Sequence, residues 1–99
     1  MGDDRNDSER KQPVVRLGRL LFDADVPTQL TAAGVVMDDL VRRHQAGDWG
    51  MVDDDDQEYQ DWSAAYGKTV TSTFVVWIEG KARSVFVTTE GKTTYIIIV

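Results

Sequence analysis

His44 and Asp48 are the two side chains whose types and spacing could perform catalysis. His44 is the single histidine of the 99-residue chain, and Asp48 follows it four positions later. A histidine oriented by a carboxylate can act as a general base, which makes this pair the candidate catalytic centre. The competing interpretation places His44 at a helix end, hydrogen-bonded to a free backbone carbonyl. No serine stands in the sequence context of a nucleophile elbow, and this favours the structural interpretation.

The strongest binding signal is a local excess of acidic residues. Seven acidic residues and no basic residue lie between Asp48 and Asp61, in a chain whose net charge is −6. A concentrated negative surface attracts cations or basic proteins and repels nucleic acid. We therefore expect a basic protein partner and no direct binding of nucleic acid. The candidate binding residues are Asp48, Trp49, Asp53, Asp54, Asp55, Asp56, Glu58 and Asp61.

The four consecutive aspartates at 53–56 do not have the spacing of a metal site. Calcium loops alternate their ligands and place a glycine at the tight turn. Four aspartates in a row instead fan out around a helix axis. They are typical of a helix start, with Asp53 as the N-cap and the others in the first turn, where backbone N–H groups are unpaired. We expect no metal ion and no cofactor.

The aromatic residues around the acidic stretch have two interpretations each. Trp49, between Asp48 and Gly50, is expected to dock the loop on the sheet, and the alternative is an exposed interface anchor. Tyr59, Trp62 and Tyr66 recur at helical spacing. Such a stripe is expected to face the core of the domain, and the alternative is a surface on which a ligand stacks.

The hydrophobic pattern predicts a disordered polar tail at residues 1–12 and a single α+β domain over residues 13–99. The expected order is β-α-α-α-β-β-β, a twisted antiparallel sheet of about four strands with the helices packed on one face. The strands are expected at 14–22, 69–79, 83–89 and 93–99, and the helices between Asp25 and Gly34, between Val35 and Ala46, and between Asp53 and Gly67.

Two short turns are expected to link the last three strands. Glu79-Gly80-Lys81 and Glu90-Gly91-Lys92 each place a glycine between apolar runs, which is typical of hairpins. The final run, Thr93–Val99, has apolar or β-branched residues on both faces. If it lies at the sheet edge, it can pair across a homodimer. A monomer is the alternative.

Composition excludes several classes of protein. The chain has no cysteine, so disulfides, thiolate metal sites and cysteine nucleophiles are excluded. The polar N-terminus does not have the apolar core of a signal peptide, and no apolar run approaches the ~20 residues of a membrane span. We therefore expect a cytoplasmic protein without membrane association.

The chain also resembles a family of small proteins. The residues that carry the resemblance are Leu17-Gly18-Arg19, Arg43-His44-x-x-Gly47-Asp48-Trp49-Gly50, the acidic helix, and Thr89-Glu90 followed by Thr93-Thr94. The pattern is similar to that of the uncharacterised "plasmid-related" or hypothetical proteins encoded on bacterial plasmids, integrative elements and phages. The resemblance implies a genomic setting, the cargo of mobile DNA translated in the bacterial cytoplasm, and it implies no activity.

Three functional hypotheses follow from these patterns. The first is a non-catalytic interaction protein, for example an inhibitor, whose acidic face docks on the basic, nucleic-acid-binding surface of a host or defence protein. The second is an immunity or antitoxin-like protein with the same acidic face. The third is a small hydrolase or nuclease that uses His44 and Asp48. We rank them in this order.

Overall fold

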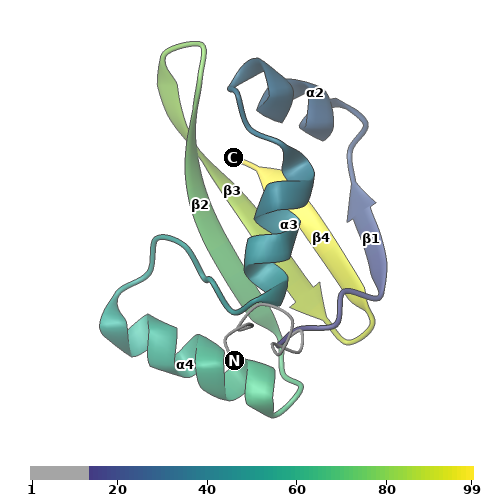
Figure 1. Ribbon diagram of the computed structural model, residues 1–99, viewed down its shortest axis with the longest axis vertical. Coiled ribbons are helices and arrows are strands. Elements are labelled where there is room, and N and C mark those ends of the chain that lie inside the picture. The colour runs from purple at the N-terminus through teal and green to yellow at the C-terminus, as the bar shows by residue number, and fades with distance from the viewer. Residues whose placement is uncertain (1–13) are drawn as a thin grey trace, which may run out of the picture.

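The computed structural model describes residues 14–99, which form four strands and three helices (Figure 1). In chain order the elements are β1 (Arg19–Phe22), α2 (Asp25–Ala32), α3 (Met37–Gln45), α4 (Asp54–Ala65), β2 (Val70–Ile78), β3 (Lys81–Glu90) and β4 (Thr93–Ile98). The α+β class and the predicted order of elements are confirmed. The tail predicted at residues 1–12 lies outside the described residues. Within residues 14–99, no helix is long and apolar enough to cross a membrane.

The sheet is mixed, with the strand order β1-β4-β3-β2. The pairs β2–β3 and β3–β4 are antiparallel, as their short hairpin turns require, but β1 runs parallel to β4. The expectation of a fully antiparallel sheet is therefore wrong at this one pair. A hairpin fixes the direction of its two strands, whereas β1 joins β4 with all three helices and two other strands between them in the chain.

Strand β1 is shorter than the sequence predicts, because the backbone turns at Gly18. Gly18 has φ +62°, and a Cβ at this position would overlap the backbone carbonyl of Lys92. This close approach lets the Arg19 N–H donate to the Lys92 carbonyl at 2.8 Å, where β1 begins. The residues before Gly18 form a loop, and the Val15 N–H donates to the Gln45 carbonyl at the end of α3.

Strand β4 lies inside the sheet, between β1 and β3. The condition for its pairing with a second copy, a place at the sheet edge, is therefore not met. The edges of the sheet are β1 and β2. Part of the β2 edge is covered by the chain itself, because Gly50 forms a parallel bridge with Thr73.

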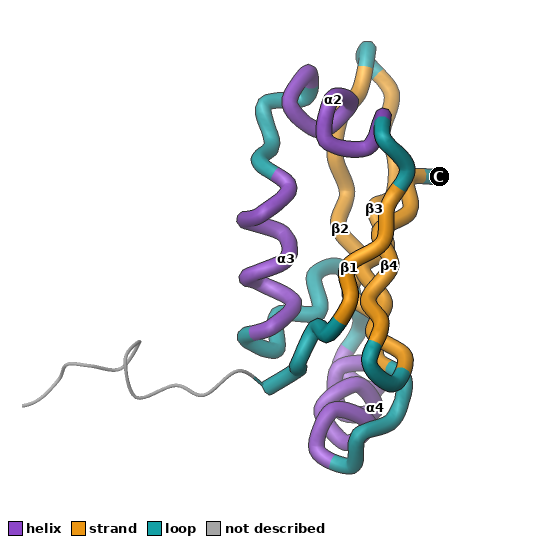
Figure 2. The backbone as a smooth tube through the Cα atoms, turned by 90° about the vertical axis from the view of Figure 1, so that its right-hand side faces the viewer, coloured by secondary structure: helices purple, strands orange, loops and turns teal. Residues whose placement is uncertain are grey.

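Helices α2 and α3 cover one face of the sheet, whereas α4 lies beyond the end of the strands (Figure 2). The main core forms between this pair of helices and the inward side of the strands, around Leu30, Leu40, Phe74, Val85 and Val87. The buried side of α3 includes His44, as its hydrophobic pattern predicts. No helix covers the opposite face of the sheet within the described part of the chain.

Candidate functional site

Trp49 fixes the loop between α3 and α4 to the body of the domain. Its side chain is 2% exposed and packs with Val15 and Val70 in a second, smaller core. The indole Nε1–H donates to the Asp61 carboxylate at 2.8 Å, so the polar atom of the buried ring is paired. The docking role predicted for Trp49 is confirmed, and the alternative of an exposed interface anchor is wrong.

Gly50 brings the same loop against the backbone of β2. The Thr73 N–H donates to the Trp49 carbonyl at 2.9 Å, and the Met51 N–H donates to the Thr73 carbonyl at 2.7 Å. Gly50 has φ +76°, and a Cβ here would overlap the Thr73 carbonyl. Only glycine fits both the left-handed backbone and the close contact.

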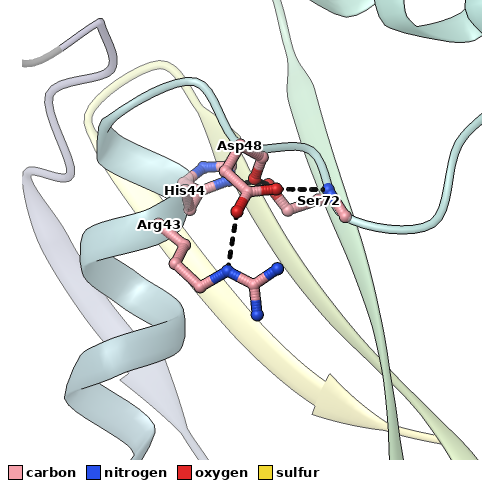
Figure 3. A network of polar contacts seen from close by, with 5 residues as sticks. Arg43, His44, Asp48 and Ser72 are labelled. Atoms are coloured by element: carbon pink, nitrogen blue, oxygen red, sulfur yellow. Dashed lines mark hydrogen bonds and ion pairs between the residues drawn. The ribbon is translucent and has the colours of Figure 1, made fainter.

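Asp48 is bonded to its own loop and to α3 (Figure 3). The Arg43 Nε–H donates to one carboxylate oxygen at 2.7 Å, and the Gly50 N–H donates to the other at 3.0 Å. Burial alone would raise the pKa of Asp48, but the hydrogen bonds from Arg43 and Gly50, together with the Arg43 charge, lower the pKa overall. The carboxylate does not orient His44, so the predicted acid–base pair is wrong.

His44 is fully buried, and both ring nitrogens contact hydroxyl groups on the sheet. Nδ1 lies 2.7 Å from Ser72 Oγ on β2, and Nε2 lies 2.9 Å from Thr89 Oγ1 on β3. The Ser72 hydroxyl also donates to the Asp48 carbonyl at 3.0 Å. The alternative prediction, a hydrogen bond from His44 to a free carbonyl at the helix end, is therefore also wrong.

The hydrogen-bonded chain continues from β3 to the loop before β1. Thr89 Oγ1 lies 2.7 Å from Thr94 Oγ1, whose hydroxyl donates to the Leu17 carbonyl at 2.8 Å. His44 therefore sits in the middle of a line of five polar contacts that joins α3, β2, β3 and β4. Such a network ties a helix to the sheet at a fixed position.

The number of hydrogens available for the five contacts of this network depends on the charge of His44. Each hydroxyl has one hydrogen to donate, and a neutral imidazole has one. Ser72, Thr89, Thr94 and neutral His44 thus supply four hydrogens for five contacts. A protonated ring would fill all five, but burial away from water opposes the charge and lowers the pKa of His44 to about 4. At neutral pH the ring is therefore uncharged, and one contact has no hydrogen.

These contacts give His44 a structural role. A general base must reach solvent or substrate, and this ring has no exposed surface. Within residues 14–99, no group of three or more histidine, cysteine, aspartate or glutamate side chains is arranged to hold a metal ion.

The acidic helix α4 begins as the sequence predicts. Asp53 is the N-cap, and its carboxylate accepts the Asp56 N–H at 2.8 Å. The next three aspartates lie exposed in the first turn. Negative charge there is favourable because of the helix dipole, although one or two carboxylates are enough for that effect.

The outward side of α4 combines acidic and aromatic side chains. We call this surface the α4 outer face: Asp55, Glu58, Tyr59, Trp62 and Tyr66, which recur at helical spacing. The three aromatic side chains are 59%, 48% and 67% exposed, so their predicted place in the core is wrong. The rings lie in a row, with centroids 6.3 Å apart for Tyr59–Trp62 and 5.1 Å apart for Trp62–Tyr66.

The opposite side of α4 explains why the aromatic residues face outward. Ser63 is fully buried and Ala64 packs against the small core of Trp49 and Val70. Small side chains let the helix approach this core closely, and Asp61 reaches the Trp49 indole from the same helix. The aromatic row, on another side of the helix, therefore stays in solvent.

The structure divides the eight predicted binding residues into two groups. Asp48, Trp49, Asp53 and Asp61 make the internal contacts described above. The other four, Asp54, Asp55, Asp56 and Glu58, are exposed, and their side chains form no hydrogen bond or ion pair to another residue within 14–99.

Ser72, Thr89 and Thr94 complete the His44 network and were not predicted from the sequence. One signal was present, because Ser72 interrupts the inward apolar side of β2 between Val70 and Phe74. The pairing of Thr89 with Thr94 follows from the β3–β4 register.

Comparisons with models of known protein families, with curated proteins and with solved structures give no match.

Proposed function

We propose that this protein is a small non-catalytic interaction protein that binds a basic protein partner through the α4 outer face. The observation that carries the proposal is the exposed row of Tyr59, Trp62 and Tyr66 beside carboxylates that have no hydrogen-bond or ion-pair partner within residues 14–99. Exposed tryptophan and tyrosine are typical of binding hot spots. The surrounding charge selects a positively charged partner.

The chemistry of this face favours arginine over other cationic groups. A guanidinium can stack on an aromatic ring and also form paired hydrogen bonds with a carboxylate. Asp55 and Glu58 lie beside Tyr59 and Trp62 at the spacing of one helical turn, so one extended arginine-rich segment can use both kinds of contact. Asp54 and Asp56 add negative charge on the flanks.

The resemblance to proteins of bacterial mobile elements supports a cytoplasmic setting for this role. In that setting, the nucleic-acid-binding surface of a host or defence protein offers exposed arginines. An immunity or antitoxin-like role would use the same face against a basic toxin. The geometry of His44 and Asp48 favours neither a hydrolase nor a nuclease.

Binding to a short oligoarginine peptide, measured by isothermal titration calorimetry at low and high salt, tests the proposal. We expect binding that weakens as salt rises, because the carboxylates are exposed. Asp55→Asn with Glu58→Gln should lower the affinity by about tenfold, since each exposed pair contributes roughly 0.5–1 kcal/mol. Trp62→Ala should lower it by about fivefold or more through the lost cation–π contact.

A matched control removes the same charge elsewhere. Asp23→Asn with Asp38→Asn also neutralises two exposed carboxylates, which lie before α2 and in the first turn of α3. This variant should bind within about twofold of the wild type, because its carboxylates are outside the α4 outer face. An equal loss of affinity in both double variants, or no binding by the wild type, would overturn the proposal.

A further inference from the structure

The face of the sheet opposite α2 and α3 is apolar and open. Strand register places the outward residues: Val75 and Trp77 on β2, Phe86 on β3, Tyr95 and Ile97 on β4, Leu21 on β1, and Val99 after β4. We call this surface the open sheet face. Trp77 is 66% exposed and Ile97 is 54% exposed, so large apolar side chains stand in solvent.

Within the four strands, charged side chains lie at one end of this face, and Asp23, just after β1, lines a hollow with Tyr95 and Ile97 at the β1 edge. The other outward positions of β2 and β3 are Thr71, Thr73, Ala82, Ser84 and Thr88, all uncharged. The charged ones, Arg19 and Glu90, flank Thr93 in the last row. A solvated face of an antiparallel sheet usually alternates apolar-in with polar-out, so this composition is typical of a sheet with both faces covered.

We propose that the open sheet face is a homodimer interface, in which a second copy of the chain packs face to face as a β-sandwich. The interface is distinct from the α4 outer face and does not depend on the function proposed for it. Sheets packed in this way lie about 10 Å apart, and their inner side chains interdigitate.

The area of the face fits a stable dimer. Four strands about 4.8 Å apart, with the longer strands rising about 3.3 Å per residue, span a flat area of roughly 500 Å². Protruding side chains make the accessible area larger than this. A specific interface buries roughly 800 Å² per partner, so the two areas are of the same order.

The pattern of side chains on the face also fits a second copy. The large residues form a diagonal band from Trp77 and Val75 on β2, through Phe86 at the centre, to Tyr95 and Leu21 at the other edge. A two-fold axis that lies in the interface along this band, or across it, superposes the band of one copy on the band of the other, and the contact is then isologous. The band carries no charge, so neither copy has to bury an unpaired ion.

Other segments of the chain do not fit this surface. The first twelve residues, MGDDRNDSERKQ, contain one large apolar residue and seven charged ones. The α4 outer face carries Asp55 and Glu58, which would lose their water without gaining a cationic partner there. A second copy of the open sheet face supplies a flat, uncharged apolar surface of matching size.

The experiment is size-exclusion chromatography with light scattering, on the full chain over a range of concentrations. The wild type should have twice the 11.1 kDa mass of one chain at the upper concentrations. Trp77→Lys and Ile97→Lys should each raise the dimer dissociation constant by at least about thirtyfold, since they bury an unpaired charge within the apolar contact. Raising salt should strengthen the dimer, because each copy has a net charge of −6.

Val36→Lys is the matched control, because Val36 is 58% exposed and lies at the N-terminal end of α3, on the opposite, helix-covered side of the sheet. It should remain a dimer. Circular dichroism and a thermal melt show whether each variant folds, and Trp77→Thr with Ile97→Thr replaces any lysine variant that does not. A wild type that is monomeric at every concentration, or folded variants that dimerise as well as the control, would overturn the proposal.

Discussion

The loop at Gly47–Gly50 and the outer face of α4 are close neighbours in sequence, yet their polar and aromatic side chains have opposite environments. In the loop, Asp48 and Trp49 make hydrogen bonds inside the domain, and Trp49 is buried. On α4, Trp62 is about half exposed. Residues of the same types therefore stabilise the fold in one region and remain available to a partner in the other.

Negative charge in a sequence does not by itself define a binding surface. Asp53 caps a helix and Asp61 accepts a hydrogen bond from Trp49, so neither is free to recognise a partner. Asp55 and Glu58 have no such internal role within residues 14–99. The contrast between the two groups can be tested with matched substitutions.

The largest difference in the free energy of unfolding is expected between substitutions of the two tryptophans, Trp49 and Trp62. Trp49→Ala should reduce the free energy of unfolding by roughly 3–5 kcal/mol, because it leaves a cavity in the small core and an unpaired Asp61. Trp62→Ala should change it by less than about 0.5 kcal/mol, since the ring is about half exposed and is not part of a buried core cluster. Urea unfolding of both variants measures the difference. Similar losses in the two variants would contradict the assignment of inner and outer roles.

Two glycines with nearly the same backbone conformation give the next test. Gly50 and Gly80 have φ +76° and +77°, but only a Cβ at Gly50 would overlap a neighbour. Gly80→Ala should cost about 1 kcal/mol of stability from the left-handed backbone alone, and Gly50→Ala about 3 kcal/mol or more. Urea unfolding separates them. Equal costs would mean that the loop does not contact β2 at Thr73.

Acid should weaken the loop region through His44. The pKa of the buried ring is lowered from 6.5 to about 4, so between these values the unfolded chain binds a proton that the folded chain does not. The stability from this group is complete above pH 6.5 and falls by about 3 kcal/mol as the pH drops to 4.

Because His44 is the only histidine, an NMR titration of its ring follows the group directly. The expected result is a neutral ring until the pH approaches 4. A ring that titrates near pH 6.5 in the folded protein would show either that it is accessible to water or that the fifth hydrogen bond outweighs burial.

The smallest difference in the free energy of unfolding is expected between substitutions of two aspartates of α4, Asp61 and Asp55. Asp61→Ala should cost about 1–2 kcal/mol, because the buried Trp49 N–H loses its acceptor. Asp55→Ala should cost less than about 0.5 kcal/mol, since an exposed carboxylate near a helix start contributes little. Thermal or urea unfolding compares the two, and a larger loss in Asp55→Ala would contradict the division of α4 into inner and outer sides.

Local signals predicted much of the fold. The N-cap at Asp53, the hairpin turns and the buried side of α3 depend on neighbouring residues, and each was predicted from the sequence. The docking of Trp49 was also predicted, from the glycines around it. In contrast, the partners of His44 lie 28 and 45 residues away on other elements, where sequence spacing gives no geometry.

The sequence pattern predicts the wrong side of α4 as the buried side, and this error has a physical cause. Hydrophobic periodicity favoured Tyr59, Trp62 and Tyr66 as the buried side, because large aromatic residues usually contribute most to a core. The domain instead packs α4 through Ser63 and Ala64, since Trp49 already fills the space between the helix and β2. Such competition for one site is not visible in the pattern of a single helix.

Binding through the α4 outer face is tested most directly by an NMR titration of the ¹⁵N-labelled protein with a short oligoarginine peptide. We predict that the amide shifts change along Asp55, Glu58, Tyr59, Trp62 and Tyr66, and that the Trp49 indole and the His44 ring keep their positions. Shifts centred on Gly47–Gly50 or spread evenly over all exposed carboxylates, or no shifts at all, would show that the α4 outer face is not the binding surface.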